Sequence, residues 1–256
     1  MDARAGRPVK ALLLDLDDTL VPDYASFLEA VDDCAAALGG PAGMGAVLHA
    51  RARVRWGQAP DAAALEMRDM SSWEALWAPF PAGTETWADA FRLGAWHEAL
   101  AEHGVDDREL AERLARAYRE HRHARCRPYE DAVAVLESLR GRMRLAVVTN
   151  GTEEHQRTKL DASGLTGLFD AIVTSGTVGA SKPDPAIFRA ALEAVDCSPA
   201  DAAMVGDNPL RDIAGAQQAG LRGIWIDRNG GNPSTPFRRW ANVSSSISPA
   251  SVAKHA

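Results

Sequence analysis

Side chains that could carry out chemistry gather just after several short apolar runs of this sequence. They are Asp15, Asp17, Asp18 and Thr19 after the first run, Thr149 and Asn150 after another, and further along Lys182, Asp207, Asn208 and Asp212. Carboxylates held close together repel one another and lose hydration, so such a cluster persists only if a cation neutralises it. Lys182 supplies one positive charge, and ligands that are all oxygen favour Mg²⁺. The sequence therefore predicts a magnesium site.

Parallel strands would bring these residues together. Residues 9–16 are almost wholly apolar without alternation, which is typical of a central parallel strand covered on both faces. From residue 127 onward, amphipathic helices alternate with β-rich runs: we predict helices at 129–140, 153–163, 184–195 and 210–219, and strands at 145–149, 171–175, 203–206 and 223–227. The fold class is α/β, and ligands of such sheets gather beyond the carboxyl ends of the strands.

A long helical stretch separates the first strand from the others. Residues 22–124 are rich in Ala, Leu and Arg, and Asp106 followed by Glu109 resembles a capping box before a helix at 107–124. We therefore predict a catalytic core of residues 1–21 and 125–235, and a helical cap of residues 22–124 inserted after the first strand. The tail, 236–256, is predicted to be partly disordered.

Composition narrows the class of protein. The 256 residues carry a net charge of −7, which gives no general attraction to nucleic acid or to an anionic membrane. The first residues lack the apolar segment of a signal peptide, and the apolar runs are too short to span a bilayer.

The cysteines indicate a reducing compartment. Cys34, Cys126 and Cys197 lack a C-x-x-C spacing and are interpreted as reduced thiols. We expect a cytoplasmic protein without nucleic-acid or membrane partners, and its oligomeric state stays open.

The order of the polar residues resembles the haloacid dehalogenase superfamily, in its phosphatase branch with a helical cap. Asp15-x-Asp17-x-Thr19 matches its first motif, and Thr149 and Lys182 match its second and third. Asp207 with Asp212, in the spacing G-D-x-x-x-x-D, matches its fourth. The resemblance covers about residues 9–22 and 125–228 of the chain. It implies a Rossmann-like parallel sheet core that hydrolyses a small phosphomonoester, for example a sugar phosphate or a nucleoside 5′-monophosphate.

The resemblance also implies a role for each matching residue. Asp15 would attack phosphorus and form an aspartyl-phosphate, and Asp17 would protonate the leaving oxygen and then activate water. Thr149, the Asn150 amide and Lys182 would bind the phosphoryl oxygens. The Asp15 carboxylate, the Asp17 backbone carbonyl and Asp207 would hold Mg²⁺. Asp212 is expected to orient Lys182 or a metal-bound water, and Asn208 and Thr19 are expected to support the site in the same way.

Other activities of the superfamily fit less well. Dehalogenases carry no acid two residues after the nucleophile, whereas Asp17 stands there. Phosphonate-cleaving relatives use a cap lysine, and no lysine occurs between Lys10 and Lys159. A phosphomutase stays open because it uses the same nucleophile and acid.

Two alternatives belong to another class of protein. A phospho-accepting receiver module also combines acids, a hydroxyl and a lysine at strand ends, but it places its acceptor aspartate on a later strand. A non-catalytic binding relative is expected to lack Asp15, Asp17 or Lys182.

In the predicted cap, three groups of side chains have a plain structural interpretation. Arginines at 113, 116, 119 and 122 alternate with glutamates, which favours a solvated helix face over a stripe facing an anionic substrate. Five tryptophans, at 56, 73, 77, 87 and 96, are expected mostly in the cap core. His121 and His123 point apart on a helix, which argues against a metal site there.

Overall fold

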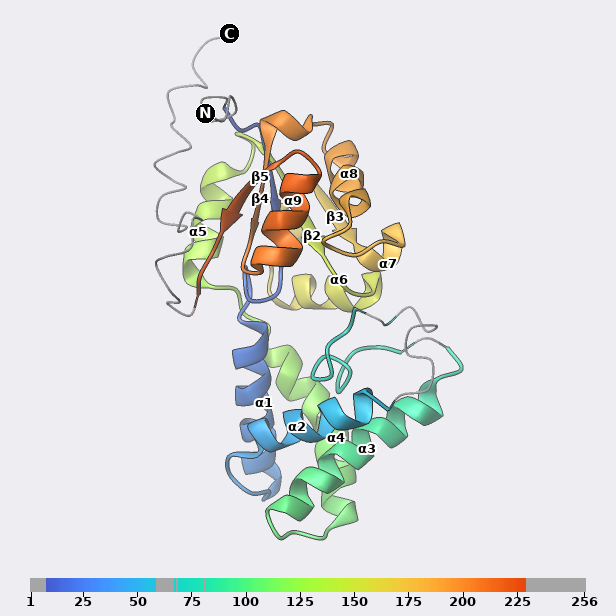
Figure 1. Cartoon of the computed structure of the whole chain (residues 1–256). Helices are drawn as coiled ribbons and strands as arrows, with labels where there is room; N and C mark the ends of the chain where they lie inside the picture. The colour runs from blue at the N-terminus through green and yellow to red at the C-terminus, as the bar shows by residue number, and fades with distance from the viewer. Residues whose placement is uncertain (1–7, 59–66, 68, 81, 229–256) are drawn as a thin grey trace. The chain divides into compact units, whose positions relative to one another are not determined.

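The computed structural model describes residues 8–58, 67, 69–80 and 82–228 (Figure 1). The described residues fall into two compact units. The first lies within Met1–Val21, Pro128–Gln156 and Gly164–Ala256, and the second lies within Pro22–Arg127 and Arg157–Ser163. The tail predicted to be disordered lies outside the described residues. In the described part of the chain, no helix combines the length and the apolar character needed to cross a membrane.

The first unit is built on a parallel sheet, and its described residues contribute five strands. These are β1 (Ala11–Leu14), β2 (Arg144–Thr149), β3 (Ala171–Thr174), β4 (Ala202–Gly206) and β5 (Arg222–Trp225), in the order β3-β2-β1-β4-β5. All neighbouring strands are parallel, and β1 lies in the centre with all four residues buried. The predicted α/β class and parallel sheet are confirmed.

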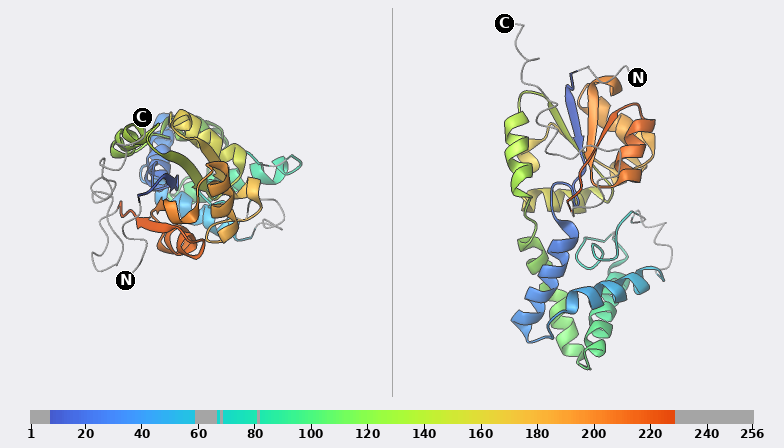
Figure 2. Two further views of the ribbon diagram at one scale, coloured as in Figure 1. Left: turned by 90° about the horizontal axis from the view of Figure 1, so that it is seen from above. Right: turned by 60° about the vertical axis from the view of Figure 1, so that its left-hand side comes forward.

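Helices cover both faces of this sheet. On one face α8 (Pro185–Ala194) and α9 (Gly215–Gln218) pack against alternate strand residues, including Leu13 and Met204. Helix α5 (Glu130–Leu139) lies on the opposite face, as Figure 2 shows. The remaining elements of the chain between β2 and β4 are α6 (Glu153–Ala162), α7 (Ser175–Val178) and the 3₁₀ turns Thr166–Leu168 and Pro199–Asp201. The single helix predicted at 210–219 is instead a π-helical segment, Pro209–Ala214, followed by α9.

The second unit is helical. Its long helices are α1 (Asp23–Leu38), α2 (Met44–Trp56), α3 (Glu85–Glu102) and α4 (Arg108–Ala124), with α1 against α2 and α4, and α3 against α2 and α4. The N-cap of α4 is Asp107, whose Oδ1 accepts a hydrogen bond from Leu110 N at 2.8 Å, so the cap falls one residue after the predicted Asp106. Trp77 and Trp96 are buried in the core of this unit, and Trp56, Trp73 and Trp87 pack against it, as predicted.

The arginines of α4 do not all lie on a solvated face. Arg113, Arg116 and Arg119 are exposed, but Arg122 is buried and forms an ion pair with Asp23. The prediction of a solvated stripe is wrong for Arg122, because its guanidinium also stacks 4.9 Å from the Trp77 ring.

Arg122 belongs to a buried ionic network of the second unit. Lys159 Nζ lies 2.5 Å from Glu74 Oε1 and 3.3 Å from Asp23 Oδ1, and Trp73 Nε1 donates to Asp23 Oδ2 at 2.7 Å. Burial alone raises the pKa of Asp23, but Lys159 and Arg122 outweigh it and hold this pKa below its usual value. The network therefore keeps the Asp23 carboxylate ionised inside the unit.

Candidate active site

The central strand positions Asp15 at the carboxyl end of the sheet. Asp15 N donates to Val205 O at 2.9 Å, which extends the pairing of β1 with β4 by one residue. The Asp15 side chain is buried, and its Oδ1 lies 2.5 Å from Lys182 Nζ. A carboxylate and a lysine that the sequence separates widely thus form one buried pair.

A tight turn follows Asp15. Asp18 adopts a left-handed conformation with φ 56°, and its N donates to Val21 O at 2.7 Å. The turn buries the Thr19 side chain, whose Oγ1 lies 3.3 Å from Asp15 Oδ2 and 3.4 Å from Asp207 Oδ1 and accepts a hydrogen bond from Asp207 N at 3.0 Å. Thr19 therefore bridges the ends of β1 and β4.

The segment after β4 presents two more carboxylates. Asn208 caps the π-helical segment by accepting from Leu210 N and Arg211 N, and its own N donates to Asp212 Oδ2 at 2.9 Å. A Cβ atom at Gly206 would overlap the Asp212 side chain, so this close approach requires glycine. Asp212 Oδ1 in turn lies 2.7 Å from Lys182 Nζ, the contact expected of a residue that orients this lysine.

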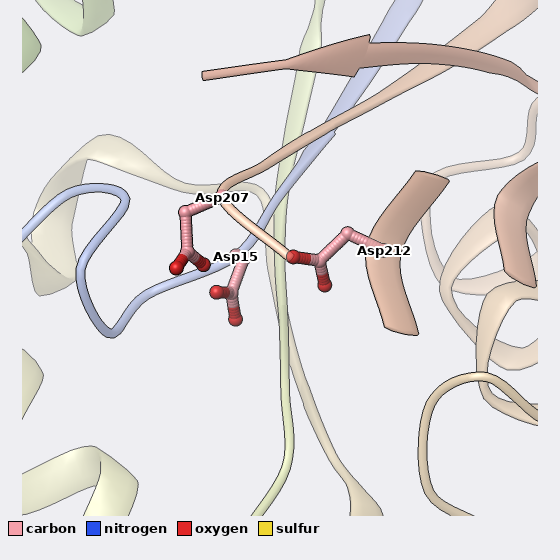
Figure 3. A group of neighbouring side chains, drawn as sticks. All are labelled: Asp15, Asp207 and Asp212. Atoms are coloured by element: carbon pink, nitrogen blue, oxygen red, sulfur yellow. The ribbon is translucent and has the colours of Figure 1, made fainter. Parts of the chain in front are cut away.

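Three carboxylates, those of Asp15, Asp207 and Asp212, turn toward a common space (Figure 3). One oxygen from each lies within 4.8 Å of the others, and Lys182 compensates part of their charge. Burial, together with the charges of Asp15 and Asp212, raises the pKa of Asp207 to about 8. Burial also raises the pKa of Asp212, to about 6.

Lys182 remains the cation of this cluster. Although burial disfavours its charge, the contacts with Asp15 and Asp212 raise the pKa of Lys182 above its usual value. The lysine therefore stays protonated at neutral pH, where it can attract an anionic group.

The donor set fits a hard divalent cation. Every candidate ligand is an oxygen, and the pKa of Asp207 is raised by burial and by neighbouring carboxylates, whose repulsion a bound cation would relieve. Of the predicted ligands, the structure brings the carboxylates of Asp15 and Asp207 together. Asp212 joins them, although both of its oxygens already have partners in Lys182 and Asn208.

The end of β2 supplies the predicted phosphate-binding residues. Thr149 is buried. In the described part of the chain, its hydroxyl donates a hydrogen bond to the backbone oxygen of Asn150 at 3.5 Å. The Asn150 side chain holds the backbone of Lys182 at both ends: its Oδ1 accepts from Lys182 N at 2.9 Å, and its Nδ2 donates to Lys182 O at 3.1 Å. The Asn150 side chain therefore holds the backbone at Lys182 in place, and Asn150 directly follows Thr149 in the sequence.

Three residues that contact this site were not identified from the sequence. Gln156 Nε2 donates to Asp17 Oδ2 at 3.3 Å, and Trp225 Nε1 donates to Asp207 O at 2.8 Å. Arg228 donates to the backbone oxygen of Thr19. Trp225 ends β5 and Arg228 follows it, so their place at the carboxyl end of a strand is the sequence signal that could identify them.

Comparison with known proteins assigns the family. Residues 9–220 match the haloacid dehalogenase-like hydrolases, and the chain belongs to that family. The resemblance predicted from the motifs is thereby confirmed, and so is the prediction of a hydrolase.

Individual relatives agree with this assignment. The chain is 42% identical over 226 residues to a phosphoserine phosphatase of Thermus thermophilus, covering 86% of this chain and 89% of the relative. It is 38% identical over 147 residues to an N-acylneuraminate-9-phosphatase of Rattus norvegicus, covering 56% of this chain and 59% of that protein. Both relatives are phosphatases, so the prediction of the phosphatase branch is confirmed.

A solved structure supports the fold. The putative HAD-hydrolase YfnB from Bacillus subtilis, bound to magnesium, has a TM-score of 0.64 and 23% sequence identity, covering 94% of this chain and 99% of its own. At this identity the similarity concerns the fold alone, and it agrees with the parallel sheet described above.

Proposed function

We propose that this protein is a Mg²⁺-dependent phosphatase that hydrolyses a small phosphomonoester through an aspartyl-phosphate on Asp15. The observation that carries the proposal is the buried Asp15 carboxylate at the end of the central strand, 2.5 Å from the Lys182 ammonium and beside two further carboxylates. A buried carboxylate paired with a lysine is a nucleophile that can be approached by an anionic phosphate, because the lysine offsets part of the repulsion.

The first step transfers the phosphoryl group to the protein. An Asp15 carboxylate oxygen attacks phosphorus while the bond from phosphorus to the leaving oxygen breaks. The proton of the Asp17 carboxyl group passes to that leaving oxygen, so an alcohol departs and Asp17 becomes ionised. Lys182 compensates the phosphoryl charge, and the Thr149 hydroxyl with the Asn150 backbone amide binds the phosphoryl oxygens.

The second step returns the protein to its starting state. Asp17 takes a proton from a water molecule, whose oxygen attacks phosphorus as the bond to Asp15 breaks. Inorganic phosphate leaves, Asp17 is protonated again, and the cycle has consumed one water.

Asp15, Asp207 and the backbone carbonyl of Asp17 would hold Mg²⁺ in this proposal. The ion supplies positive charge that lets a dianionic substrate approach an anionic nucleophile. Asp212 and Asn208 orient Lys182 and the segment after β4, and Thr19 joins Asp15 to Asp207.

The relatives narrow the substrate class. The extensive match to a phosphoserine phosphatase makes phosphoserine the first substrate to test. The match to an N-acylneuraminate-9-phosphatase supports keeping sugar phosphates, and nucleoside 5′-monophosphates remain from the sequence prediction. We assign the helical residues 22–124 as the cap that excludes bulk water and shapes the leaving-group pocket.

The proposal also covers the cellular compartment of the protein and its binding partners. All three cysteines are free thiols in the structure, which supports an enzyme of the cytoplasm. A small phosphorylated molecule is its partner, and we propose neither a nucleic acid nor a membrane as a second one.

The test is phosphate release from phosphoserine, sugar phosphates and nucleotides, with Mg²⁺ and with a chelator. Asp15→Asn should reduce release at least about 1,000-fold with the fold intact, because the amide is a poor nucleophile. The control is Asp196→Asn, an exposed residue at φ 48° where asparagine is well tolerated. Turnover that survives Asp15→Asn would remove the nucleophile assignment.

The same assay distinguishes a hydrolase from a phosphomutase. A mutase primed with a sugar bisphosphate converts a sugar monophosphate to its isomer and releases little inorganic phosphate. A hydrolase releases phosphate in proportion to the alcohol product.

A further inference from the structure

Gln156 is a buried, uncharged side chain in the first half of α6, and its amide group lies against the candidate active site. Its side chain has no exposed surface. The amide nitrogen Nε2 lies 2.5 Å from the backbone oxygen of Asn150 and 3.3 Å from Asp17 Oδ2. Both neighbours are hydrogen-bond acceptors. The NH₂ group of the amide faces them, because the amide oxygen could not donate a hydrogen bond to either.

Gly151 makes this approach possible. Its φ of 134° is a conformation that side-chain-bearing residues rarely adopt, and a Cβ atom there would lie 2.7 Å from Gln156 Nε2. The amide therefore fills space that any other residue at position 151 would occupy. The backbone of residues 150 and 151 and the Gln156 side chain therefore pack directly against each other.

We propose that Gln156 is a positioning residue for Asp17. One N–H of its amide is fixed by Asn150 O, which aims the other N–H at Asp17 Oδ2. A hydrogen bond accepted by Oδ2 disfavours a proton on that oxygen and so favours Oδ1 as the atom that carries it. Gln156 thus selects both the rotamer of Asp17 and the oxygen that delivers the proton.

The inference rests on the proposed function, in which Asp17 is the general acid. As the bond from Asp15 to phosphorus forms and the bond to the leaving oxygen breaks, the proton moves from Asp17 Oδ1 to that oxygen. Without this hydrogen bond the Asp17 carboxyl group would be oriented less well and would deliver the proton less often, whereas binding of the phosphoryl group would not change.

The test uses leaving groups that differ in their need for a proton. An alkyl phosphate releases a strongly basic alkoxide, whereas 4-nitrophenyl phosphate releases a stable phenolate without help. We expect Gln156→Met to lower the single-turnover release of the alkyl alcohol roughly 10-fold or more and to leave that of nitrophenolate within about 3-fold. Equal losses for both esters, or no loss for either, would overturn the inference.

Two controls make the result specific. Gln217 is exposed on α9, so Gln217→Met should leave both rates unchanged. If Gln156→Met does not fold, as judged by circular dichroism and thermal melting, Gln156→Leu is the second variant, because it removes the amide donor without adding a charge or an O–H donor. It should show the same selective loss.

Asp17→Asn distinguishes this inference from the proposed function. A selective loss for the alkyl ester in Asp17→Asn establishes the general acid whatever Gln156 does. If Asp17→Asn slows both esters equally, the acid assignment itself fails. If Asp17→Asn shows the selective loss and the Gln156 variants do not, Asp17 remains the general acid and the positioning role of Gln156 is wrong.

Discussion

Arg228 donates two hydrogen bonds to the backbone oxygen of Thr19, from Nε at 3.2 Å and from Nη2 at 2.8 Å. The same guanidinium makes two hydrogen bonds to Asp131, of 2.8 and 2.7 Å, and stacks 4.0 Å from the centre of the Tyr129 ring. Tyr129 N also donates to Leu20 O at 2.9 Å. Residues at the start of α5 and Arg228, which follows β5, therefore hold the turn that carries Thr19.

Arg228→Met should lower kcat about 10-fold and change KM little. Without the guanidinium, the Thr19 carbonyl loses both donors, and the hydroxyl that bridges Asp15 and Asp207 is no longer held in place. Steady-state kinetics with 4-nitrophenyl phosphate would measure this change. Arg211→Met, at an exposed arginine, is the matched control. An unchanged kcat in Arg228→Met would show that the turn holds its shape without Arg228.

Asp207→Asn should stabilise the metal-free protein at pH 8. Because the folded pKa of Asp207 is about 8, against an ordinary value of 3.8, the folded state keeps a proton that the unfolded chain loses. Stability contributed by this group is therefore complete below about pH 4 and is lost as the pH rises to about 8. The amide removes that loss, so the Tm of Asp207→Asn at pH 8 should exceed that of the unsubstituted protein by several degrees.

Thermal melting with chelator at pH 4, 6 and 8 measures this effect. The gain in Tm should be small at pH 4 and largest at pH 8, and addition of Mg²⁺ should stabilise the unsubstituted protein only. A gain that is equal at every pH would contradict the electrostatic explanation.

Magnesium binding should release a proton near neutral pH. Asp207 is mostly protonated in the metal-free protein below about pH 8, and a ligand carboxylate must be ionised. The apparent affinity should fall by up to about 10-fold for each pH unit below 8. Calorimetry in buffers of different ionisation enthalpy would count the protons released at pH 7, and a count of zero would place the metal away from Asp207.

Lys159→Met should destabilise the folded protein by about 3–5 kcal/mol, because it leaves the buried carboxylates of Asp23 and Glu74 without their shared cation. The loss should be larger at pH 8 than at pH 4, where a carboxylate deprived of its lysine takes up a proton. Chemical denaturation gives the free energy of unfolding. The control is Lys10→Met at an exposed lysine paired with Asp201, which should cost less than about 1 kcal/mol.

The sheet and the main site residues could be predicted because their signals are local. An apolar run without alternation identifies a buried parallel strand, and the residue types at its end stand next to it in the sequence. Asp15 and Asp207 are each recognisable in this way, whereas Lys182 follows β3 only after α7 and is recognisable from the order of the motifs.

The contacts of Arg228 and Gln156 could not be predicted because each depends on a partner far along the chain. The position of Arg228 after β5 does not identify Thr19 as its partner, and nothing near Gln156 indicates that it reaches Asp17. Arg122 shows the limit most directly. Its spacing suggested a solvated face, but its burial follows from Asp23, with which it pairs from another helix.

The central place of β1 also governs how the chain reaches its active form. During synthesis β1 leaves the ribosome long before its partners, since it pairs with Arg144–Val147 on one side and Ala202–Val205 on the other. Closing such long loops costs only about 0.6 kcal/mol for each doubling of length, so the intervening helices add little to the entropic cost. Until β4 is made, however, β1 has an unpaired edge that invites association with other chains. Asp15, the proposed nucleophile, is thus among the first residues of the site to be synthesised and among the last to be held in place by both neighbouring strands.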